Sequence, residues 1–243
     1  MAPTINMGIN SMKKFITTVL AFGLATAAQS QEWTGVGDFG YSDISGNSNS
    51  ETLTAALGLG YDTGGKWTHE VVLTAINSSQ QDIRAAEAYG LNWNSNYAFN
   101  EKNYGIGALR YLDDRFSGFD TQTSIRVGVG RHFIDDGITI LDAEGGIGFR
   151  RNELITGEDE DEGIIWGRSV YSRVLSDTTI FDAHGLFEAG DENTYVEAGA
   201  SIRVAMSEAL GLRVAYLLKH NTDAPAPATS TDRFLTVSLN YLF

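Results

Sequence analysis

The sequence predicts an all-β protein, namely a transmembrane, antiparallel, up-and-down β-barrel of about twelve strands. Segments of alternating apolar and polar residues recur from residue 33 to the end, and turn residues separate them. No apolar run is long enough for a comfortable membrane helix. The chain ends in an uncharged, aromatic-tipped alternating row, which would invite aggregation in water and is better suited to lipid.

Composition narrows the class without choosing the fold. The chain has 243 residues, of which 42% are hydrophobic, so it can bury a core as one barrel or sandwich, or as one to two ordinary domains. Cysteine is absent, which removes disulfides, thiolate metal sites and lipid-anchored cysteines. The formal net charge of −14 argues against a nucleic-acid partner and suits a protein among divalent cations and charged lipid headgroups.

The N-terminal residues predict export. Lys13 and Lys14 form a basic region, residues 15–24 form an apolar or hydroxyl run, and Ala25-Thr26-Ala27 offers a small-residue cleavage site. We therefore expect an extension from an early start codon at 1–11, a cleaved secretory signal peptide at 12–30, and the barrel at 31–243. This order predicts the outer membrane of a Gram-negative bacterium, with both termini in the periplasm.

Twelve segments alternate in this way, and each is long enough to cross a membrane when tilted. The last is the clearest, because Leu235, Val237, Leu239, Tyr241 and Phe243 recur at a spacing of two. We interpret Leu239, Tyr241 and Phe243 as the signal for the barrel-assembly machinery. The predicted strands are 33–41, 52–61, 67–76, 84–97, 104–112, 121–133, 138–150, 164–174, 179–188, 194–206, 210–220 and 231–243.

The connections between these segments alternate in length, as they do in a barrel with long outer loops and tight inner turns. The expected inner turns are 62–65, 100–103, 135–137, 176–177 and 207–208, with Gly65 and Gly137 at positive φ. The expected outer loops are 42–50, 77–83, 113–120, 151–162, 189–193 and 221–230.

Aromatic residues gather near the predicted strand ends, which indicates two belts at headgroup depth. The expected inner belt comprises Trp33, Trp67, Tyr97, Tyr104, Phe133 and Phe243. The expected outer belt comprises Tyr41, Trp166, Phe187, Tyr195 and Tyr216.

The opposite face of the strands carries charges of both signs, which predicts a polar lumen. Two hypotheses remain open: the charges line a narrow channel, or they pair across the lumen and seal it, because buried charges need partners. The predicted lumen-lining residues are Glu70, Arg126, Asp142, Glu144, Arg150, Asp182, Glu188, Glu197, Arg203, Arg213 and Lys219.

One predicted outer loop carries five consecutive carboxylates, Glu158, Asp159, Glu160, Asp161 and Glu162. Carboxylate oxygens suit calcium or magnesium, and such a loop could bridge to lipopolysaccharide phosphates. The spacing does not match an ordered calcium loop. A solvated acidic loop is the plainer interpretation.

No catalytic constellation is evident. The histidines His69, His132, His184 and His220 have no spacing that ties them to a nucleophile. We therefore expect neither an enzyme nor a cofactor, and an outer-membrane hydrolase is an alternative supported by fold analogy alone.

Several scattered motifs resemble the YdiY-like family of salt-induced outer-membrane proteins. They are Trp33-x-Gly35, Ser45-Gly46-Asn47-Ser48, the stretch 110–118 with Asp114, Arg115 and Phe116, Thr231-Asp232, and Ser238-Leu239-x-Tyr241-x-Phe243. The resemblance implies an outer-membrane barrel that responds to salt or osmotic conditions, and it brings no catalytic residue.

Together these observations predict a passive role. The first hypothesis is a narrow channel for ions or small solutes, or an envelope protein of salt stress. The second is a sealed structural barrel that bridges lipopolysaccharide through divalent cations. The expected partners are the lipid bilayer, lipopolysaccharide, the assembly machinery and small solutes, and no nucleic acid.

Overall fold

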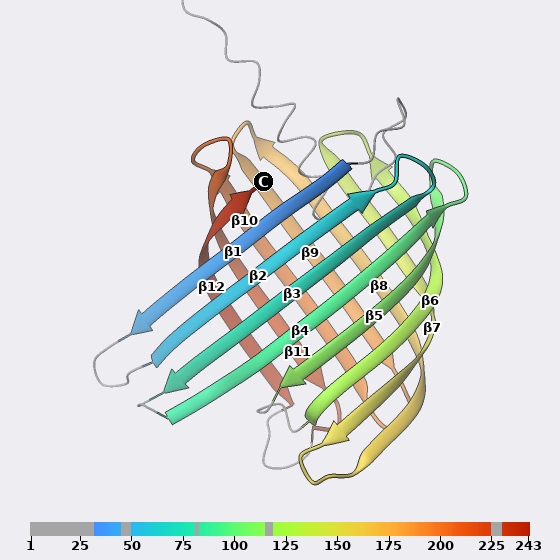
Figure 1. The fold of residues 1–243 in the computed structure, drawn as a ribbon, viewed down its shortest axis with the longest axis vertical. Coiled ribbons are helices and arrows are strands. Elements are labelled where there is room, and N and C mark those ends of the chain that lie inside the picture. The colour runs from blue at the N-terminus through green and yellow to red at the C-terminus, as the bar shows by residue number, and fades with distance from the viewer. Residues whose placement is uncertain (1–31, 45–49, 81–82, 115–118, 225–229) are drawn as a thin grey trace, which may run out of the picture.

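The computed structural model describes residues 32–44, 50–80, 83–114, 119–224 and 230–243, and over these the chain is an antiparallel barrel closed between its first and last strands (Figure 1). The two expected N-terminal segments, 1–11 and 12–30, lie outside these residues. The strands are β1 (Glu32–Ile44), β2 (Ser50–Asp62), β3 (Trp67–Gln80), β4 (Ile83–Ala98), β5 (Asn103–Asp114), β6 (Phe119–Asp135), β7 (Thr139–Leu154), β8 (Asp159–Ser176), β9 (Thr179–Ala189), β10 (Thr194–Ala205), β11 (Leu210–Asn221) and β12 (Thr231–Leu242).

The predicted up-and-down barrel of twelve strands is confirmed, and every strand pairs with its neighbours in sequence. Within the described ranges, no helix has the length and hydropathy needed to span a bilayer. The expected outer loop 151–162 is wrong in its bounds, because β7 runs to Leu154 and β8 starts at Asp159. Apart from Leu154, residues 151–154 and 159–162 are polar, so apolar alternation gave no sign that the ladder continues.

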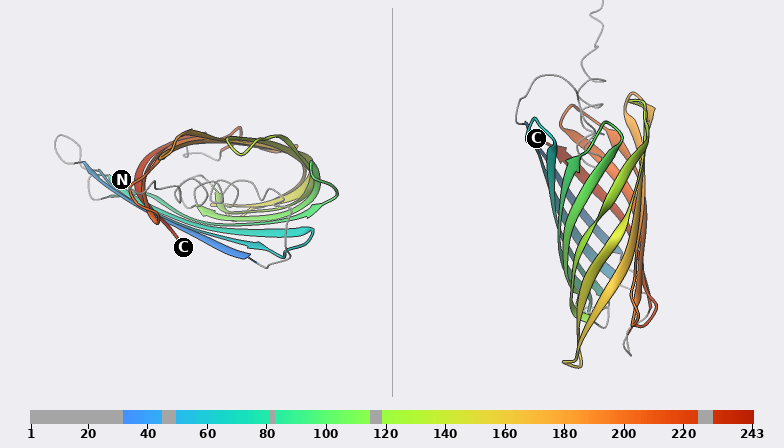
Figure 2. Two further views of the ribbon diagram at one scale, coloured as in Figure 1. Left: turned by 90° about the horizontal axis from the view of Figure 1, so that it is seen from above. Right: turned by 90° about the vertical axis from the view of Figure 1, so that its right-hand side faces the viewer.

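The strands are strongly staggered. Glu32, at the start of β1, pairs with Asp62, and the row of paired residues that continues through Thr68 and Trp166 ends at Asn221, the far end of β11. Such a stagger requires the strands to tilt against the barrel axis, as Figure 1 shows. Seen from above, the barrel is a flattened ellipse rather than a circle (Figure 2).

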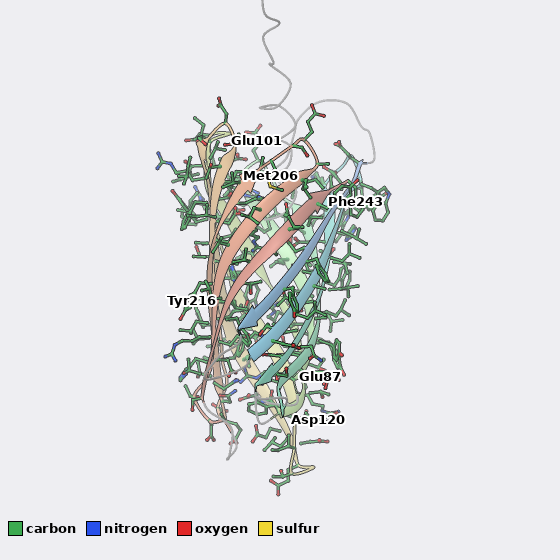
Figure 3. All side chains as sticks on the ribbon, turned by 90° about the vertical axis from the view of Figure 1, so that its left-hand side faces the viewer. Glu87, Glu101, Asp120, Met206, Tyr216 and Phe243 are labelled. Carbon is green, nitrogen blue, oxygen red and sulfur yellow. The ribbon has the colours of Figure 1, made fainter. Side chains whose placement is uncertain are left out.

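The barrel has the reverse polarity of a water-soluble sheet. In β6 the apolar residues Ile125, Val127 and Val129 are 57%, 54% and 62% exposed, whereas the interleaved Ser124 and Arg126 are 2% and 5% exposed. Tyr216 likewise projects from the outer wall in Figure 3. An apolar exterior around a polar interior is the pattern of a barrel embedded in lipid.

Residues at the two ends of the barrel can be located in Figure 3. Glu101 and Met206 lie at the end that carries Phe243, whereas Glu87 and Asp120 lie at the opposite end.

Two turns contain a glycine with positive φ. Gly137 has φ 77°, as predicted, but in the β2–β3 turn positive φ falls on Gly64 at 72° rather than on Gly65. The reason is local, because the backbone N–H of Gly64 donates to Asp62 Oδ1 at 2.8 Å and fixes the turn one residue earlier.

The β6–β7 turn carries a similar carboxylate cap. The backbone N–H groups of Thr139 and Ile138 donate to Asp136 Oδ1 at 2.7 and 2.9 Å. These bonds lower the pKa of Asp136 below its ordinary value because they favour the ionised carboxylate. Their contribution is therefore present near neutral pH and is lost as pH falls through the lowered pKa.

The predicted aromatic belts are only partly right. Trp33, Trp67 and Phe243 are exposed on the outer wall at 69%, 46% and 64%. Three other predicted belt residues instead lie inside the barrel, namely Tyr104, Trp166 and Tyr195, with 5%, 2% and 1% exposure. Each shares its strand face with charged residues, and hydrogen bonding inside the lumen satisfies its polar tip.

The seam between β1 and β12 is the shortest ladder in the described barrel. Its paired residues run only from Val36↔Leu242 to Gly40↔Ser238, whereas β1 pairs with β2 along its full length. Gly35 and Phe243 extend the seam by exchanging backbone N–H···O bonds of 2.9 and 3.1 Å. On the lumen side, Asp38 accepts from Asn240 Nδ2 at 3.0 Å, so side chains reinforce the closure.

A pair of cysteines tests this register. Phe39 and Leu239 are opposite one another and both are exposed on the outer wall. We expect Phe39→Cys with Leu239→Cys to form a disulfide under mild oxidation, because directly opposed residues satisfy disulfide geometry and the chain has no other cysteine. The measurement is the crosslinked fraction on a denaturing gel.

The matched control is Phe39→Cys with Tyr241→Cys, which lies two residues out of register. It should crosslink poorly, since diagonal neighbours are about 7–8 Å apart. Preferential crosslinking of this offset pair would show that the seam is paired differently.

Candidate functional site in the barrel lumen

The lumen collects the charged side chains. The structure places the sequence-predicted residues Glu70, Arg126, Asp182, Glu197, Arg203, Arg213 and Lys219 around one cavity. Asp142 lines a smaller pocket, Glu144 bonds lumen-facing partners, and Arg150 and Glu188 are fully buried. These side chains form separate clusters rather than an even lining.

The largest cluster surrounds Glu188 and is called the Glu188 cluster: Arg110, Arg126, Arg150, Glu162 and Glu188. Glu188 is 0% exposed, and Nη1 of Arg110, Arg126 and Arg150 lies 3.4, 3.4 and 3.6 Å from its oxygens. Arg150 also donates to Glu162 from Nη2 at 2.5 Å and from Nε at 3.0 Å. Three guanidinium groups thus meet two carboxylates, across strands β5 to β9.

Two aromatic rings support this cluster. The Arg110 guanidinium lies 4.0 Å from the Tyr195 ring centre, and the Arg126 guanidinium lies 5.4 Å from that of Trp166. Trp166 is itself fixed, because its Nε1 donates to the carbonyls of Val127 and Ile147 at 3.2 and 3.1 Å. These contacts hold the planes of the two guanidinium groups.

Two glycines of β6 make room for the rings of Trp166 and Tyr104. A methyl group on Gly128 would come within 2.8 Å of the Trp166 ring, and one on Gly130 would clash with Tyr104. The missing side chains let both aromatic rings lie against the wall. This glycine pair therefore shapes the filled part of the lumen.

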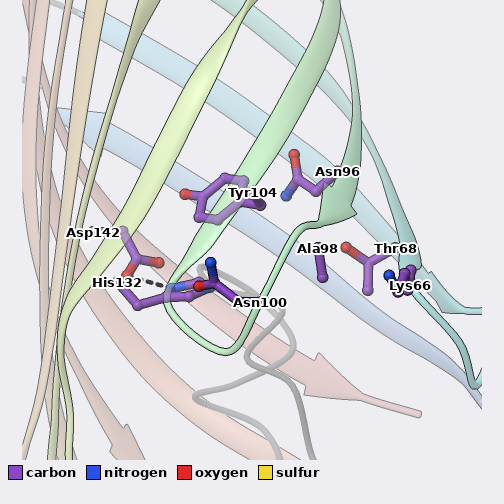
Figure 4. A pocket seen from close by; sticks show the side chains of 8 residues that line it. All are labelled: Lys66, Thr68, Asn96, Ala98, Asn100, Tyr104, His132 and Asp142. Atoms are coloured by element: carbon purple, nitrogen blue, oxygen red, sulfur yellow. Dashed lines mark hydrogen bonds and ion pairs between the residues drawn. The ribbon is translucent and has the colours of Figure 1, made fainter.

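A second cluster joins β5, β7 and β8. Glu144 accepts from Tyr104 Oη at 2.9 Å and from Arg168 Nη1 at 3.3 Å. Beside it, His132 Nδ1 and Asp142 Oδ1 are 2.8 Å apart, the contact dashed in Figure 4. Tyr104, His132 and Asp142 border a pocket of about 20 Å³, which is room for a single water molecule.

Smaller pairs complete the lumen. Asp182 accepts from Ser172 Oγ at 2.7 Å and from Arg203 Nη2 at 3.4 Å. Asp38 accepts from Arg213 Nη1 at 3.3 Å. Glu197 accepts from Tyr195 Oη at 2.6 Å and lies 3.3 Å from His184 Nε2.

A cavity of about 860 Å³ occupies the part of the lumen that these clusters leave open. Small residues of β2 and β4 line it, including Ala56, Gly58 and Gly90, together with arginines of β5, β6, β8, β10 and β11. The cavity reaches Ser207 and Phe243 at the end of the barrel that carries the C-terminus. The lumen is thus filled on one side and open on the other.

The other predicted site residues are placed differently. The acidic run does not form a single loop: Asp159–Glu162 belong to β8, Asp161 pairs with Arg151 on the exposed wall at 2.6 Å, and Glu162 is buried. No group of three or more acidic or histidine side chains in the described ranges could hold a metal. Asp114 is buried at the end of β5, and Arg115 and Phe116 lie outside the described residues.

The C-terminal residues Leu239, Tyr241 and Phe243 are 49%, 54% and 64% exposed on the outer wall. The histidines are dispersed: His132 and His184 contact carboxylates in the lumen, whereas His69 stacks against Trp67 with ring centres 6.0 Å apart. His220 Nδ1 lies 2.8 Å from Thr231 Oγ1.

Several lumen residues were missed by sequence reasoning, above all Arg110, Arg168 and Glu162. The pattern that could have identified them is the spacing of two along each strand, which assigns alternate residues to the lumen face. Arg110 shares a face of β5 with Ala108 and Leu112, which look like a lipid-facing row although they are 5% and 8% exposed inside the barrel. Apolar residues on the inner face therefore concealed the charged one.

A family model described as "Protein of unknown function, DUF481" matches residues 37–243. The chain belongs to the DUF481 family. This family member is also 29% identical over 208 residues to the uncharacterized protein YdiY of Escherichia coli strain K12, covering 83% of this chain and 80% of that protein. The resemblance to YdiY-like proteins is confirmed.

Solved structures share the fold at low sequence identity. An outer membrane channel from Pseudomonas putida F1 matches with a TM-score of 0.51 and 9% identity, over 91% of this chain and 98% of that one. The translocator domain of the autotransporter NalP from Neisseria meningitidis matches with a TM-score of 0.49 and 14% identity, over 97% and 96%. The closed antiparallel barrel and the match to the Pseudomonas putida channel together show that this DUF481 protein has the fold of an outer-membrane β-barrel.

Glu188→Gln tests the central cluster. The amide keeps the shape of the side chain but leaves three buried guanidinium groups around a neutral partner, so we expect a loss of about 3–5 kcal/mol in the free energy of unfolding. The measurement is urea unfolding in detergent micelles, followed by tryptophan fluorescence.

Asp161→Asn is the control, because it removes a carboxylate from an exposed arginine pair on the outer wall. It should leave the urea midpoint close to that of the unaltered protein. Equal midpoints for the two variants would contradict a central role for Glu188.

Proposed function

We propose that this protein is a passive channel of the Gram-negative outer membrane, exported through a cleaved signal peptide, with both termini periplasmic. The observation that supports the proposal best is the cavity of about 860 Å³ beside the filled half of the lumen. It is lined by charged groups of both signs and by small residues, which suits hydrated ions and small polar solutes. Barrels of this strand number lie between filled small barrels and open porins.

The filled half supports a second hypothesis, a sealed structural barrel. The Glu188 cluster ties five strands together through buried ion pairs, which would stiffen the wall. Bridging to lipopolysaccharide through divalent cations has weaker support, because Asp161 and Glu162 of the acidic run engage arginines instead.

A catalytic role has little support. The two lumen-facing histidines, His132 and His184, contact carboxylates at 2.8 and 3.3 Å rather than a hydroxyl nucleophile. A role in salt stress belongs to the proposal through the resemblance to salt-induced proteins, since an ion pathway is a function such a protein would supply.

Conductance tests the channel directly. Purified protein in planar bilayers should give stepwise currents, and Ala56→Trp should lower the step size, because Ala56 lines the cavity. A silent bilayer at high protein dose would reject the channel in favour of the sealed barrel.

Leu53→Trp is the matched control. Leu53 lies in β2, is 43% exposed on the outer wall and does not line the cavity, so a tryptophan there should meet lipid and leave the step size unchanged. Equal reductions in the two variants would show that the current does not pass through this cavity.

A further inference from the structure

We propose that Arg110 and Arg126 form a binding site for small organic carboxylates on the wall of the lumen cavity. The inference rests on the proposed channel and names the class of solute that it would take. It is drawn from three features of the two side chains: unused hydrogen-bond donors, unbalanced charge and fixed orientation.

The first feature is the donors. Arg110 and Arg126 side chains are 7% and 5% exposed, and both line the cavity. Nη2 of Arg110 and Nε of Arg126 are buried without a hydrogen-bond partner among the described residues. A buried donor left without an acceptor costs free energy, so a ligand that accepts these bonds gains affinity.

The second feature is charge. Glu188 is shared by three arginines, and Glu162 is the one other carboxylate that the ion pairs of this cluster include. Within this cluster three guanidinium groups therefore share two carboxylates, which leaves one formal positive charge that a bound anion would balance. The excess belongs to this cluster alone, because the cavity lining as a whole also carries Asp38, Glu70, Asp182 and Glu197.

The third feature is orientation. Each guanidinium lies against an aromatic ring, Arg110 on Tyr195 and Arg126 on Trp166, so little side-chain entropy remains to be lost on binding. A planar guanidinium held in place matches the two oxygens of a carboxylate better than a point charge does.

The rest of the cavity favours an organic anion over an inorganic one. Val36, Val72 and Leu112 line it together with the glycines and alanine of β2 and β4. These apolar groups offer contacts to a carbon skeleton. The volume of about 860 Å³ lies within the range of pockets that enclose small organic ligands.

The test is a binding titration of the purified full chain in detergent micelles. The probe is sodium glucuronate, with glucose as the uncharged control and sodium chloride to match ionic strength. Trp166 lies beneath Arg126, so binding should change tryptophan fluorescence and raise the thermal unfolding midpoint. We expect a saturable response to glucuronate and none to glucose.

The variant Arg110→Gln with Arg126→Gln should weaken glucuronate binding by about tenfold or more. Glu188 keeps Arg150 and Ser124 as partners in this variant, which supports the fold. Replacing both arginines by lysine keeps the charge and removes the planar fork, so intermediate affinity is expected. Arg151→Gln, on the exposed wall, is the control and should bind as the unaltered protein does.

The binding titration and the conductance measurement test the carboxylate site and the channel separately. Equal responses to glucuronate and glucose, a stronger response to inorganic phosphate, or full affinity in the glutamine variant would overturn the carboxylate site. Saturable binding by a barrel that carries no current would support the site and reject the channel. Stepwise current without glucuronate binding would support the channel and reject the carboxylate site.

Discussion

The whole structure depends on the rule that a chain in lipid must satisfy its backbone hydrogen bonds internally. Twelve strands meet this rule by closing into a barrel. The closure has the fewest backbone pairs at the seam, where β1 and β12 share the shortest ladder in the described barrel. Alternation along each strand then sends apolar side chains outward and charges inward. The closed wall encloses the charged side chains that point inward. Because buried charges need partners, these side chains form ion pairs with one another in the lumen.

That pairing divides the lumen into two halves. Across β5 to β9, three arginines converge on Glu188, with Trp166 and Tyr195 packed beneath two of them. Across β1 to β4 the inner face carries many small residues, including Thr54, Ala56, Gly58 and Gly90, and there the cavity opens. The filled half supplies rigidity and charge, whereas the open half supplies space. The proposed channel and the proposed carboxylate site both lie where the two halves meet.

Two glycines of β6 contribute to this asymmetry. Gly128 and Gly130 would each obstruct an aromatic ring if they carried a side chain. Because Gly128 and Gly130 have no side chains, Trp166 and Tyr104 can lie inside the barrel rather than on its outer surface at the depth of the lipid headgroups. Their polar atoms then bond the backbone of Val127 and Ile147, and the carboxylate of Glu144. Small residues in a strand here serve the packing of large ones on a neighbouring strand.

The sequence by itself determined the closed barrel, the number and order of its strands, and the inward face of residues such as Arg126 and Glu197, because a period of two is a local property of a strand. The same spacing of two along β8 puts Trp166 on one face with Glu162 and Arg168, although its position near a strand end led to the prediction that it belongs to the outer aromatic belt. Only the tertiary structure decided which charges meet: Arg110 of β5 and Glu188 of β9 lie 3.4 Å apart in the closed barrel, a contact that no local pattern encodes. The same holds for the cavity, since empty space is left by side chains from distant strands and belongs to no segment of the chain.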